Sequence, residues 1–590
     1  MSSSGSLRPA EPGPVEPAGM GVKSQHRQQR GGRLPAPSLE LVIYAGAVLV
    51  AGMLIVYPLI ALFREAVRGV DGSVLGGFLN VLREPRVLLA AKHSVQVSIG
   101  TTVVATILGV SLAVIVSRTN TPFTRYMELV GALPLLTMPF VGGIAWTLLA
   151  SPRVGFLNGL VRAVLNLHME EGPLNIYSLS GLIWVMGLYY SPYVFLLTNS
   201  GLRSIDASME EAARLAGARP AQVLRRVSIP LVTPAIISGA LLTFALASSQ
   251  FGVPRVIGVP ARIEVLPTVI YAKAQTYPVD IAELSGIGLI LLAMTATALV
   301  LQRYWIRRRV YETVTGKGSR NSVIDLGSWK YLALAVGVGY LFAAVVLPFL
   351  ALLYASFLRY TAATIRIDLL TLDNYSKVFH SPLTLRSLKN SALLSFVTAT
   401  LCLALGFILS YLVHRTKLRG RAAIQFMTMI PLGVPSIVLS VGVLSAWIRP
   451  PLVLYGSLAI LVVAYWGHFL PTAMQAVMAG LLQINRELED AAHVSFAKWL
   501  PTMRYIVVPL IRRSLMAGWL LLVITIFREL SASVLLYVPG KEVMSVALLT
   551  FWESGSFNAV AAFSTLVVGL SLLVFVAIQA LTGWRQEVTE

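Results

Sequence analysis

The chain has 590 residues, of which 56% are hydrophobic and only 13% are charged. Soluble domains usually carry about a quarter charged residues, so this composition excludes an ordinary water-soluble enzyme and a disordered chain. A membrane-spanning helix needs about 20 apolar residues, and twelve such helices would use roughly half of the chain. The composition therefore predicts an all-α polytopic membrane protein with about twelve spans.

The formal net charge is +20, from 47 basic and 27 acidic residues. In a soluble protein this excess would suggest a nucleic-acid partner. The cytoplasmic loops of membrane proteins also collect Lys and Arg, so we expect membrane lipid and no nucleic acid as a partner. The single cysteine, Cys402, excludes an intrachain disulfide framework and a Cys-based metal site.

Residues 1–38 contain Ser, Gly, Pro and basic side chains, and no apolar segment precedes Leu39. We therefore expect a disordered basic cytoplasmic tail and no cleaved signal peptide. Two sets of six apolar spans follow, separated by a linker at 313–329. The first set is predicted at 40–63, 93–117, 126–150, 179–200, 235–254 and 281–302, and the second at 331–357, 390–413, 423–447, 453–479, 514–536 and 556–583.

The two sets are an internal duplication, which is the first pattern to seek in a chain of this length. The segment GLRSIDASMEEAARLAGARPAQVLRRVSIPL from Gly201 aligns without a gap with GLLQINRELEDAAHVSFAKWLPTMRYIVVPL from Gly480. A second match upstream includes Arg118 with Arg415 and Pro134 with Pro431. The two matches have different residue offsets between the halves, so the first half carries extra sequence, which falls near 151–178.

Each half therefore contains six spans, at 39–312 and 330–590. An even number of spans makes the repeats parallel, related by a pseudo-two-fold axis along the membrane normal. The basic residues at 303–309 directly follow a predicted span, which favours the cytoplasmic side for the linker. Both termini are then expected in the cytoplasm.

The duplicated polar segments, 201–234 and 480–513, lie between spans four and five of each half. Asp206 is suited to cap a helix, and Gly217 is suited to end one. Pro220 favours the first turn of a second short helix, which Pro230 is expected to end before the next span. We predict two short helices at the inner membrane surface, with small alanines that let another protein approach closely.

At this point the sequence resembles a known family. Glu211-Ala212-Ala213, then Gly217 and Ile229-Pro230-Leu231, are similar to the EAA loop of ATP-binding-cassette importer permeases, over residues 90–310 and 385–590. In that family the loop docks on a separate ATPase subunit. The resemblance implies coupling roles for Glu210, Glu211, Ala212, Ala213, Gly217, Pro230, Glu489, Asp490, Ala491, Ala492 and Pro509.

The same resemblance implies the partners. We expect two copies of a cytoplasmic ATP-binding subunit and an extracytoplasmic substrate-binding protein, at the inner membrane of a bacterium. A phosphate-binding loop needs G-x-x-x-x-G-K-[ST], and the nearest imitation, at 311–318, lacks its first glycine and its final Ser or Thr. The chain is therefore expected to be a permease subunit without catalytic residues or cofactor, with ATP and Mg on the partner.

The second loop departs from the family pattern. Asp490 stands in place of the glutamate, and Phe496 in place of the glycine. If Gly217 takes a left-handed conformation, Phe496 can take it only with strain. We therefore predict unequal docking of the two halves.

The segments Ser248–Gly258 and Phe527–Gly540 resemble those of permeases that import ferric iron, and Fe(III) is the expected cargo. Permeases for thiamine, polyamines and 2-aminoethylphosphonate are similar and remain alternatives.

Ionisable groups within spans are costly and often functional. Arg528 and Glu529 fall inside a predicted span, and as neighbours on a helix they would not pair. With Gln250 and Phe251 they are candidates for the translocation path, and the alternative is a partner on a neighbouring span. Glu283 and Glu553 lie at predicted span edges and are expected to be wet.

No metal site is expected in the chain. The seven histidines form no H-x-x-x-H or comparable ligand pair. His468 lies in a span and is expected to be an interior residue whose hydrogen bonds are satisfied.

Two other classes remain open. An ion-coupled secondary transporter can also have parallel six-plus-six repeats, but it would need protonatable groups near mid-membrane, and the spans hold few. The third class is a channel or scaffold that does not pump. Loss of uptake on ATP depletion with the proton gradient preserved would separate the importer from both.

Overall fold

A computed structural model of the chain describes residues 39–68, 76–166, 168–308, 323–361, 366–416, 418–450 and 452–582. The expected N-terminal tail at 1–38 and the linker up to residue 322 lie outside the described residues. In the described part all the regular elements are helices, besides two isolated β-bridges, Thr119 with Ile324 and Leu358 with Leu370. The all-α prediction is therefore confirmed.

The helices of the first half follow the predicted spans, with short helices between them. They are α1 (Leu39–Val67), α2 (Gly76–Arg83), α3 (Pro85–Arg118), α4 (Thr124–Ala132), η1 (Leu133–Leu136), α5 (Pro139–Ala150), α6 (Phe156–Leu165), α7 (Leu179–Arg203), α8 (Ala207–Leu215), α9 (Pro220–Val223), η2 (Leu224–Ser228), α10 (Ile229–Ser248), η3 (Pro254–Gly258), α11 (Leu266–Ala274) and α12 (Ile281–Arg308).

The second half has a similar order of elements, with its first span divided by the π turn η5. It contains η4 (Gly327–Trp329), α13 (Lys330–Leu341), η5 (Phe342–Val346), α14 (Leu347–Phe357), α15 (Asp373–His380), α16 (Pro382–Arg415), α17 (Arg421–Met429), η6 (Ile430–Leu432), α18 (Ser436–Trp447), α19 (Leu458–Leu481), α20 (Glu487–Val494), α21 (Trp499–Thr502), η7 (Met503–Val507), α22 (Val508–Phe527), α23 (Ser533–Leu536), α24 (Met544–Glu553) and α25 (Phe557–Thr582).

Nine helices of the described chain are long and apolar enough to cross a membrane, or eleven if two bent pairs are each counted as one span. The bent pairs are the third spans, predicted as straight helices at 126–150 and 423–447. They break instead, by 96° before α5 and by 108° before α18. Proline lacks a backbone donor and clashes with the preceding turn, and prolines flank each break, at Pro134 and Pro139 and at Pro431 and Pro435.

The fifth spans also end earlier than predicted. The helix α10 stops at Ser248 and α22 stops at Phe527, rather than at 254 and 536. Arg528 is the C-cap residue of α22, so Arg528 and Glu529 lie just beyond a helix and not within one. The Glu529 carbonyl there accepts hydrogen bonds from the Ser533 and Ser545 hydroxyls, at 2.8 and 2.7 Å.

The first helix of each half packs on the other half. The helix α1 contacts α16, α17, α18 and α19, besides α12 of its own half. Its backbone approaches so closely that a Cβ at Gly467 would lie 2.7 Å from the Leu54 carbonyl oxygen, and one at Gly442 2.6 Å from that of Pro58. In return α13 and α14 contact α4 and α5. This exchange joins the halves.

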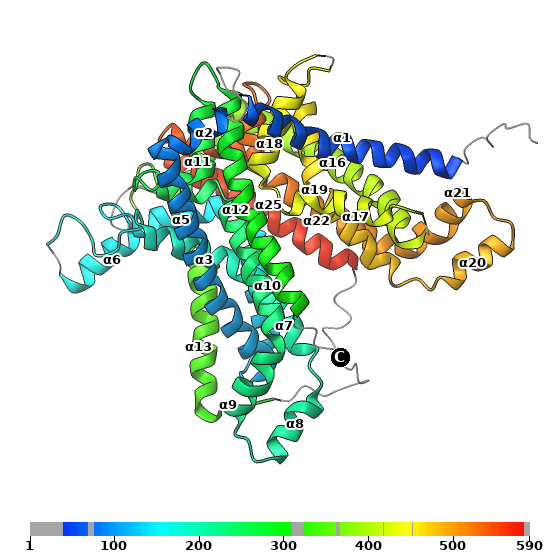
Figure 1. Ribbon diagram of the computed structural model, residues 1–590. Helices are drawn as coiled ribbons and strands as arrows, with labels where there is room; N and C mark the ends of the chain where they lie inside the picture. Colours follow the sequence, from blue (N-terminus) through cyan, green and yellow to red (C-terminus); the bar gives the residue numbers. More distant parts are fainter. Residues whose placement is uncertain are drawn as a thin grey trace, which may run out of the picture.

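The two helix bundles diverge from a common end. Figure 1 shows α8 at the bottom and α20 at the right, at the two far ends of the molecule, while α2, α11 and α18 gather at the top. The duplicated polar loops therefore lie at the tips of the two bundles, and the segments that follow the fifth spans lie where the bundles meet. We call the latter region the closed end.

Candidate functional site: the paired polar loops

The first polar loop forms the short helices that the sequence predicts. Asp206 caps α8 by accepting a hydrogen bond from the Ser208 backbone N–H, at 2.9 Å. After α8 the Ala218 N–H bonds the Ala213 carbonyl at 3.0 Å and the Gly217 N–H bonds that of Arg214 at 2.9 Å. These are the two bonds of a Schellman helix end, and they turn the chain into α9.

Pro230 does not end the second short helix as expected. The helix α9 runs through η2, a π turn, directly into α10, with Pro230 in the first turn of α10. Pro509 has the same place after the π turn η7. A π turn bonds residues five apart, and this wider turn accommodates a residue that has no N–H to donate. Each loop is therefore continuous with its fifth span.

Within the first loop, Glu210 is buried and forms an ion pair. The Arg118 Nε lies 3.0 Å from Glu210 Oε1, and both side chains are only 2% exposed. The Ser228 hydroxyl donates to the same carboxylate at 2.8 Å. Arg118 also donates from Nη2 to the Leu202 carbonyl, at 2.5 Å. One arginine at the end of α3 thus joins α8 to the end of α7.

The second loop repeats this arrangement. The Arg415 Nε lies 3.2 Å from Glu489 Oε1, and Arg415 Nη2 donates to the Leu481 carbonyl at 2.7 Å. The remaining carboxylate oxygen accepts a bond from the Tyr411 hydroxyl, at 2.8 Å. Tyr411 comes from α16, whereas Ser228 comes from η2. The arginine and its carbonyl are therefore common to both loops, and the hydroxyl partner is not.

Adjacent acidic residues in each loop have opposite environments. Glu210 and Glu489 are buried, whereas Glu211 and Asp490 are exposed. Ala212 and Ala491 are exposed as well, Ala213 is half-buried and Ala492 is buried. The exposed residues are available to another protein. The buried glutamates can act only within the chain, by holding α8 and α20 to the spans.

The arginines are the functional residues that sequence reasoning missed. Arg118 and Arg415 served only as markers of the duplication, yet they bind the loop glutamates. The signal was available, because a buried glutamate needs a cation and the arginine recurs at the end of the second span in both halves. Their separation from the glutamates along the chain hid the pairing.

Gly217 and Phe496 both adopt the left-handed conformation, as the repeat predicted. Their φ angles are +83° and +56°. A Cβ at Gly217 would meet nothing within 4 Å, and the Phe496 side chain is 94% exposed. Glycine takes this conformation freely, but phenylalanine does so with strain. The second loop therefore carries strain and an exposed aromatic ring that the first loop lacks.

The linker is bound to the first loop region. Ile324 N–H bonds the Arg118 carbonyl at 2.8 Å, and Asn120 N–H bonds the Ile324 carbonyl at 3.1 Å. The Asn120 side chain donates to Asp325 at 2.5 Å and accepts from the Leu326 N–H at 3.0 Å. The Gly327 N–H and the Asn120 amide lower the pKa of Asp325. The carboxylate therefore stays ionised and holds the linker.

The candidates for the translocation path lie at the closed end. Arg528 donates to the carbonyls of Leu135 and Thr137, the latter at 2.6 Å, and these belong to the broken third span of the other half. Glu529 accepts bonds from the Ser436 hydroxyl at 3.0 Å and the Ala532 N–H at 3.1 Å. Each residue thus has partners on other segments, as the alternative reading expected.

The two path candidates of the first half, Gln250 and Phe251, are bound more simply, and of these Gln250 is the counterpart of Glu529 in the repeat. Gln250 accepts a bond from the Tyr190 hydroxyl at 3.0 Å. Phe251 is fully buried and packs edge-on against Tyr271, with ring centroids 5.0 Å apart. In this conformation Phe251 is a packing residue and lines no open path.

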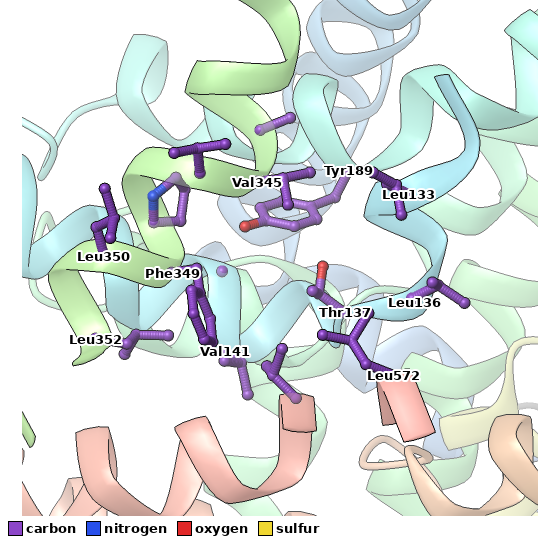
Figure 2. A pocket seen from close by; sticks show the side chains of 15 residues that line it. Leu133, Leu136, Thr137, Val141, Tyr189, Val345, Phe349, Leu350, Leu352 and Leu572 are labelled. Carbon is purple, nitrogen blue, oxygen red and sulfur yellow. The ribbon is translucent and has the colours of Figure 1, made fainter. Parts of the chain in front are cut away.

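An apolar pocket of about 200 Å³ lies between the halves. Figure 2 shows Val345, Phe349, Leu350 and Leu352 of the second half facing Leu133, Val141 and Tyr189 of the first, with Leu572 closing one side. Tyr189 and Thr137 supply the polar groups of the labelled lining. Such a lining suits hydrocarbon rather than an ion, so the pocket is not a cargo site for a metal.

The chain is similar in sequence to known transport permeases. Residues 105–312 match the family described as binding-protein-dependent transport system inner membrane components. The ferric transport system permease protein FbpB of Actinobacillus pleuropneumoniae is 25% identical over 537 residues, which cover 90% of this chain and 76% of the relative. A putative ferric transport system permease protein of Haemophilus influenzae is 26% identical over 502 residues, covering 83% and 77%.

A putative 2-aminoethylphosphonate transport system permease protein of Salmonella choleraesuis is 29% identical over 231 residues. That match covers 38% of this chain and 78% of the relative. The similarity to the ferric permeases therefore includes both halves of the chain, whereas the similarity to this relative does not.

Proposed function

We propose that this chain, an ATP-binding-cassette importer permease that resembles the ferric-iron permeases, forms the complete membrane pathway of an Fe(III) importer. ATP and Mg bind to two copies of a partner ATPase, and this chain itself hydrolyses no ATP. A substrate-binding protein outside the inner membrane of the bacterium delivers the iron. The N- and C-termini face the cytoplasm, with α8 and α20.

One observation carries the proposal: each half has, between its fourth and fifth spans, an exposed short helix that a buried ion pair fastens to the spans. An exposed helix alone is only a docking surface. The Arg118–Glu210 and Arg415–Glu489 pairs add a rigid connection from that surface to the second and fourth spans. Two such connections fit a protein that is moved by two partner subunits.

The coupling follows from these contacts. When an ATPase subunit moves, it displaces the exposed face of α8 at Glu211 and Ala212. The displacement passes through Glu210 to Arg118 at the end of α3, and through the Leu202 carbonyl to the end of α7. A buried charge pair resists separation because each charge would be left unpaired. The helices α3 and α7 therefore move with α8, and the bundle rocks as one body.

The cargo assignment rests on coverage. The ferric relatives match both halves, and the 2-aminoethylphosphonate relative matches 38% of the chain. Thiamine, polyamines and 2-aminoethylphosphonate stay as alternative cargoes of the same machinery. An ion-coupled transporter is disfavoured because it has no use for two exposed helices fastened to its spans.

The test is purification of the tagged chain from native membranes in mild detergent, followed by identification of the chains that co-purify. We expect an ATPase at two copies per permease, lost when Glu211→Arg and Asp490→Arg are combined. Liposomes that hold the complex should then take up Fe(III) with ATP and the binding protein. Uptake that persists without ATP hydrolysis, or a stable permease that captures no ATPase by cross-linking at residue 213, would contradict the proposal.

A further inference from the structure

An ion pair joins the two halves at the closed end. Arg255, in η3 of the first half, donates from Nε and Nη2 to Glu553 Oε1 at 3.0 and 2.6 Å. Glu553 is the last residue of α24, in the second half. The Tyr271 hydroxyl lies 3.4 and 3.5 Å from the two carboxylate oxygens, and the Arg255 guanidinium lies 5.4 Å from the Tyr271 ring centroid.

The surrounding contact between the halves is tight. A Cβ at Gly252 would lie 3.2 Å from a methyl carbon of Leu530 and 2.8 Å from the Phe140 Cβ. The helices α11 and α23 also touch across the seam. Arg255 follows Gly252 by three residues, so the ion pair lies at the edge of a seam where the halves are pressed together.

The ion pair is present on one side of the pseudo-two-fold axis. In the repeat, α11 is the counterpart of α24. The Leu266 N–H donates to the Ser94 hydroxyl at 2.8 Å, and the Met544 N–H donates in the same way to the Ser391 hydroxyl at 2.7 Å. The counterpart of Glu553 in this register is Gln275, and the counterpart of Arg255 in the register of the polar loops is Val534. These two residues cannot form an ion pair, so the Arg255–Glu553 contact has no symmetric copy. A different ion pair between the halves, Arg449 with Glu65 at 3.0 Å, fastens the end of α1 to the chain after α18.

Its exposure suits a contact that is made and broken. The Arg255 and Glu553 side chains retain 29% and 33% of their accessible surface, so water can hydrate both charges when they separate. A fully buried pair would leave two desolvated charges on opening. The buried Arg118–Glu210 pair stays closed within one moving body, whereas Arg255–Glu553 lies between two bodies.

We propose that Arg255 and Glu553 form an outer latch, an ion pair that holds the pathway closed on the side of the binding protein and opens when the halves rock apart. This inference rests on the proposed function. The bundles diverge toward α8 and α20 and meet at the end where α11 lies (Figure 1), so the latch lies at the end opposite the two helices that would dock on the ATPases. ATP-driven closure of the ATPases must break the latch before iron can enter.

The chain supplies a matched control. Arg86 donates to Glu264 at 2.7 and 2.6 Å, with exposures of 48% and 28%, but both residues belong to the first half. The Arg86 guanidinium lowers the pKa of Glu264, so this pair is charged at neutral pH. Arg86→Gln removes an ion pair of similar geometry that lies within the first half, although Glu264 also interacts with the charge of Arg255.

The experiment measures ATP hydrolysis by the reconstituted permease–ATPase complex, with and without the binding protein. We expect Arg255→Gln and Glu553→Gln each to raise the rate without binding protein by about two- to fivefold, the range for losing a partly exposed ion pair, and to reduce stimulation by the binding protein. The exchange Arg255→Glu with Glu553→Arg should return the rate toward wild type. Arg86→Gln should behave as wild type.

Two results would overturn the latch while leaving the proposed function intact. In the first, the wild-type complex is stimulated by the binding protein, but the single variants at Arg255 and Glu553 hydrolyse ATP without it no faster than wild type and Arg86→Gln. The other is activated single variants that the charge exchange does not restore. Melting temperatures of all variants separate misfolding from activation, because a damaged complex loses hydrolysis rather than gaining it. A wild-type complex that does not hydrolyse ATP would contradict the proposed function itself.

Discussion

The two polar loops share the same ion-pair arrangement but differ in how deeply that ion pair is buried and in the residue at the left-handed turn. In both, an arginine at the end of the second span binds a loop glutamate and the carbonyl at the end of the fourth span. The first pair is 2% exposed on each side, whereas Arg415 and Glu489 are 13% and 6% exposed. The first loop also has glycine at its left-handed turn and the linker bound beside it.

The difference shows which parts of the loop the fold requires and which it tolerates losing. The buried ion pair is kept twice, so a rigid connection between helix and spans is needed in each half. The glycine, the exposed glutamate and the linker contact occur once. We infer that the second loop keeps its connection to the spans but binds its ATPase subunit more weakly than the first loop does.

Breaking the ion pairs should give the largest effects. Removing one partner of a buried pair leaves an uncompensated charge and costs about 3–5 kcal/mol, so Arg118→Met should lower the melting temperature of the complex most. Arg415→Met should cost less, about 1.5–3 kcal/mol, because its pair is more exposed and behaves more like a charged hydrogen bond.

The control is Arg203→Met, which removes a surface pair with Glu128 at 45% and 35% exposure. Such pairs contribute under about 1 kcal/mol. If Arg118→Met were no more damaging than Arg203→Met, the first ion pair would not be the connection described here.

Exchanging the residues at the left-handed turns should give an intermediate effect. Gly217→Phe imposes strain of about 1–2 kcal/mol and places a ring on the docking surface of α8. Phe496→Gly relieves that strain, so it should leave the protein equally or more stable. In ATP-driven uptake assays, Gly217→Phe should therefore impair transport more than Phe496→Gly, and equal impairment would contradict unequal docking.

Freeing the linker should give the smallest effect. Asn120→Ala removes one bond to Asp325 and one from the Leu326 N–H, which together are worth about 1–2 kcal/mol. Hydrogen exchange of residues 323–326 should accelerate, while exchange in α20 should be unchanged. Faster exchange in both loops would show that the linker is not specific to the first half.

The sequence predicted the parts of this site that depend on local chemistry. A helix cap at Asp206 and a left-handed turn at Gly217 follow from backbone preferences, and the structure has both. The left-handed Phe496 goes against those preferences and follows from its alignment with Gly217. The duplication located both loops, because aligning the sequence with itself is enough to find it.

The sequence left open the features that depend on distant packing. Glu210 and Glu211 are neighbours of the same type, and only the position of Arg118 decides which one is buried. The broken third spans arise from prolines that the hydropathy pattern does not register. The exchange of α1 and the Arg255–Glu553 contact join segments some 300 residues apart or more, for which no local rule exists.

The most direct test compares Glu211→Arg with Asp490→Arg in ATP-driven Fe(III) uptake by liposomes that contain the purified complex and its binding protein. Each change reverses one exposed charge on a docking helix and leaves the buried pairs intact. We predict that both lower uptake and that Glu211→Arg lowers it more, by about tenfold, the equivalent of 1.4 kcal/mol. Undiminished uptake in both variants would contradict the claim that these two helices couple the permease to its ATPases.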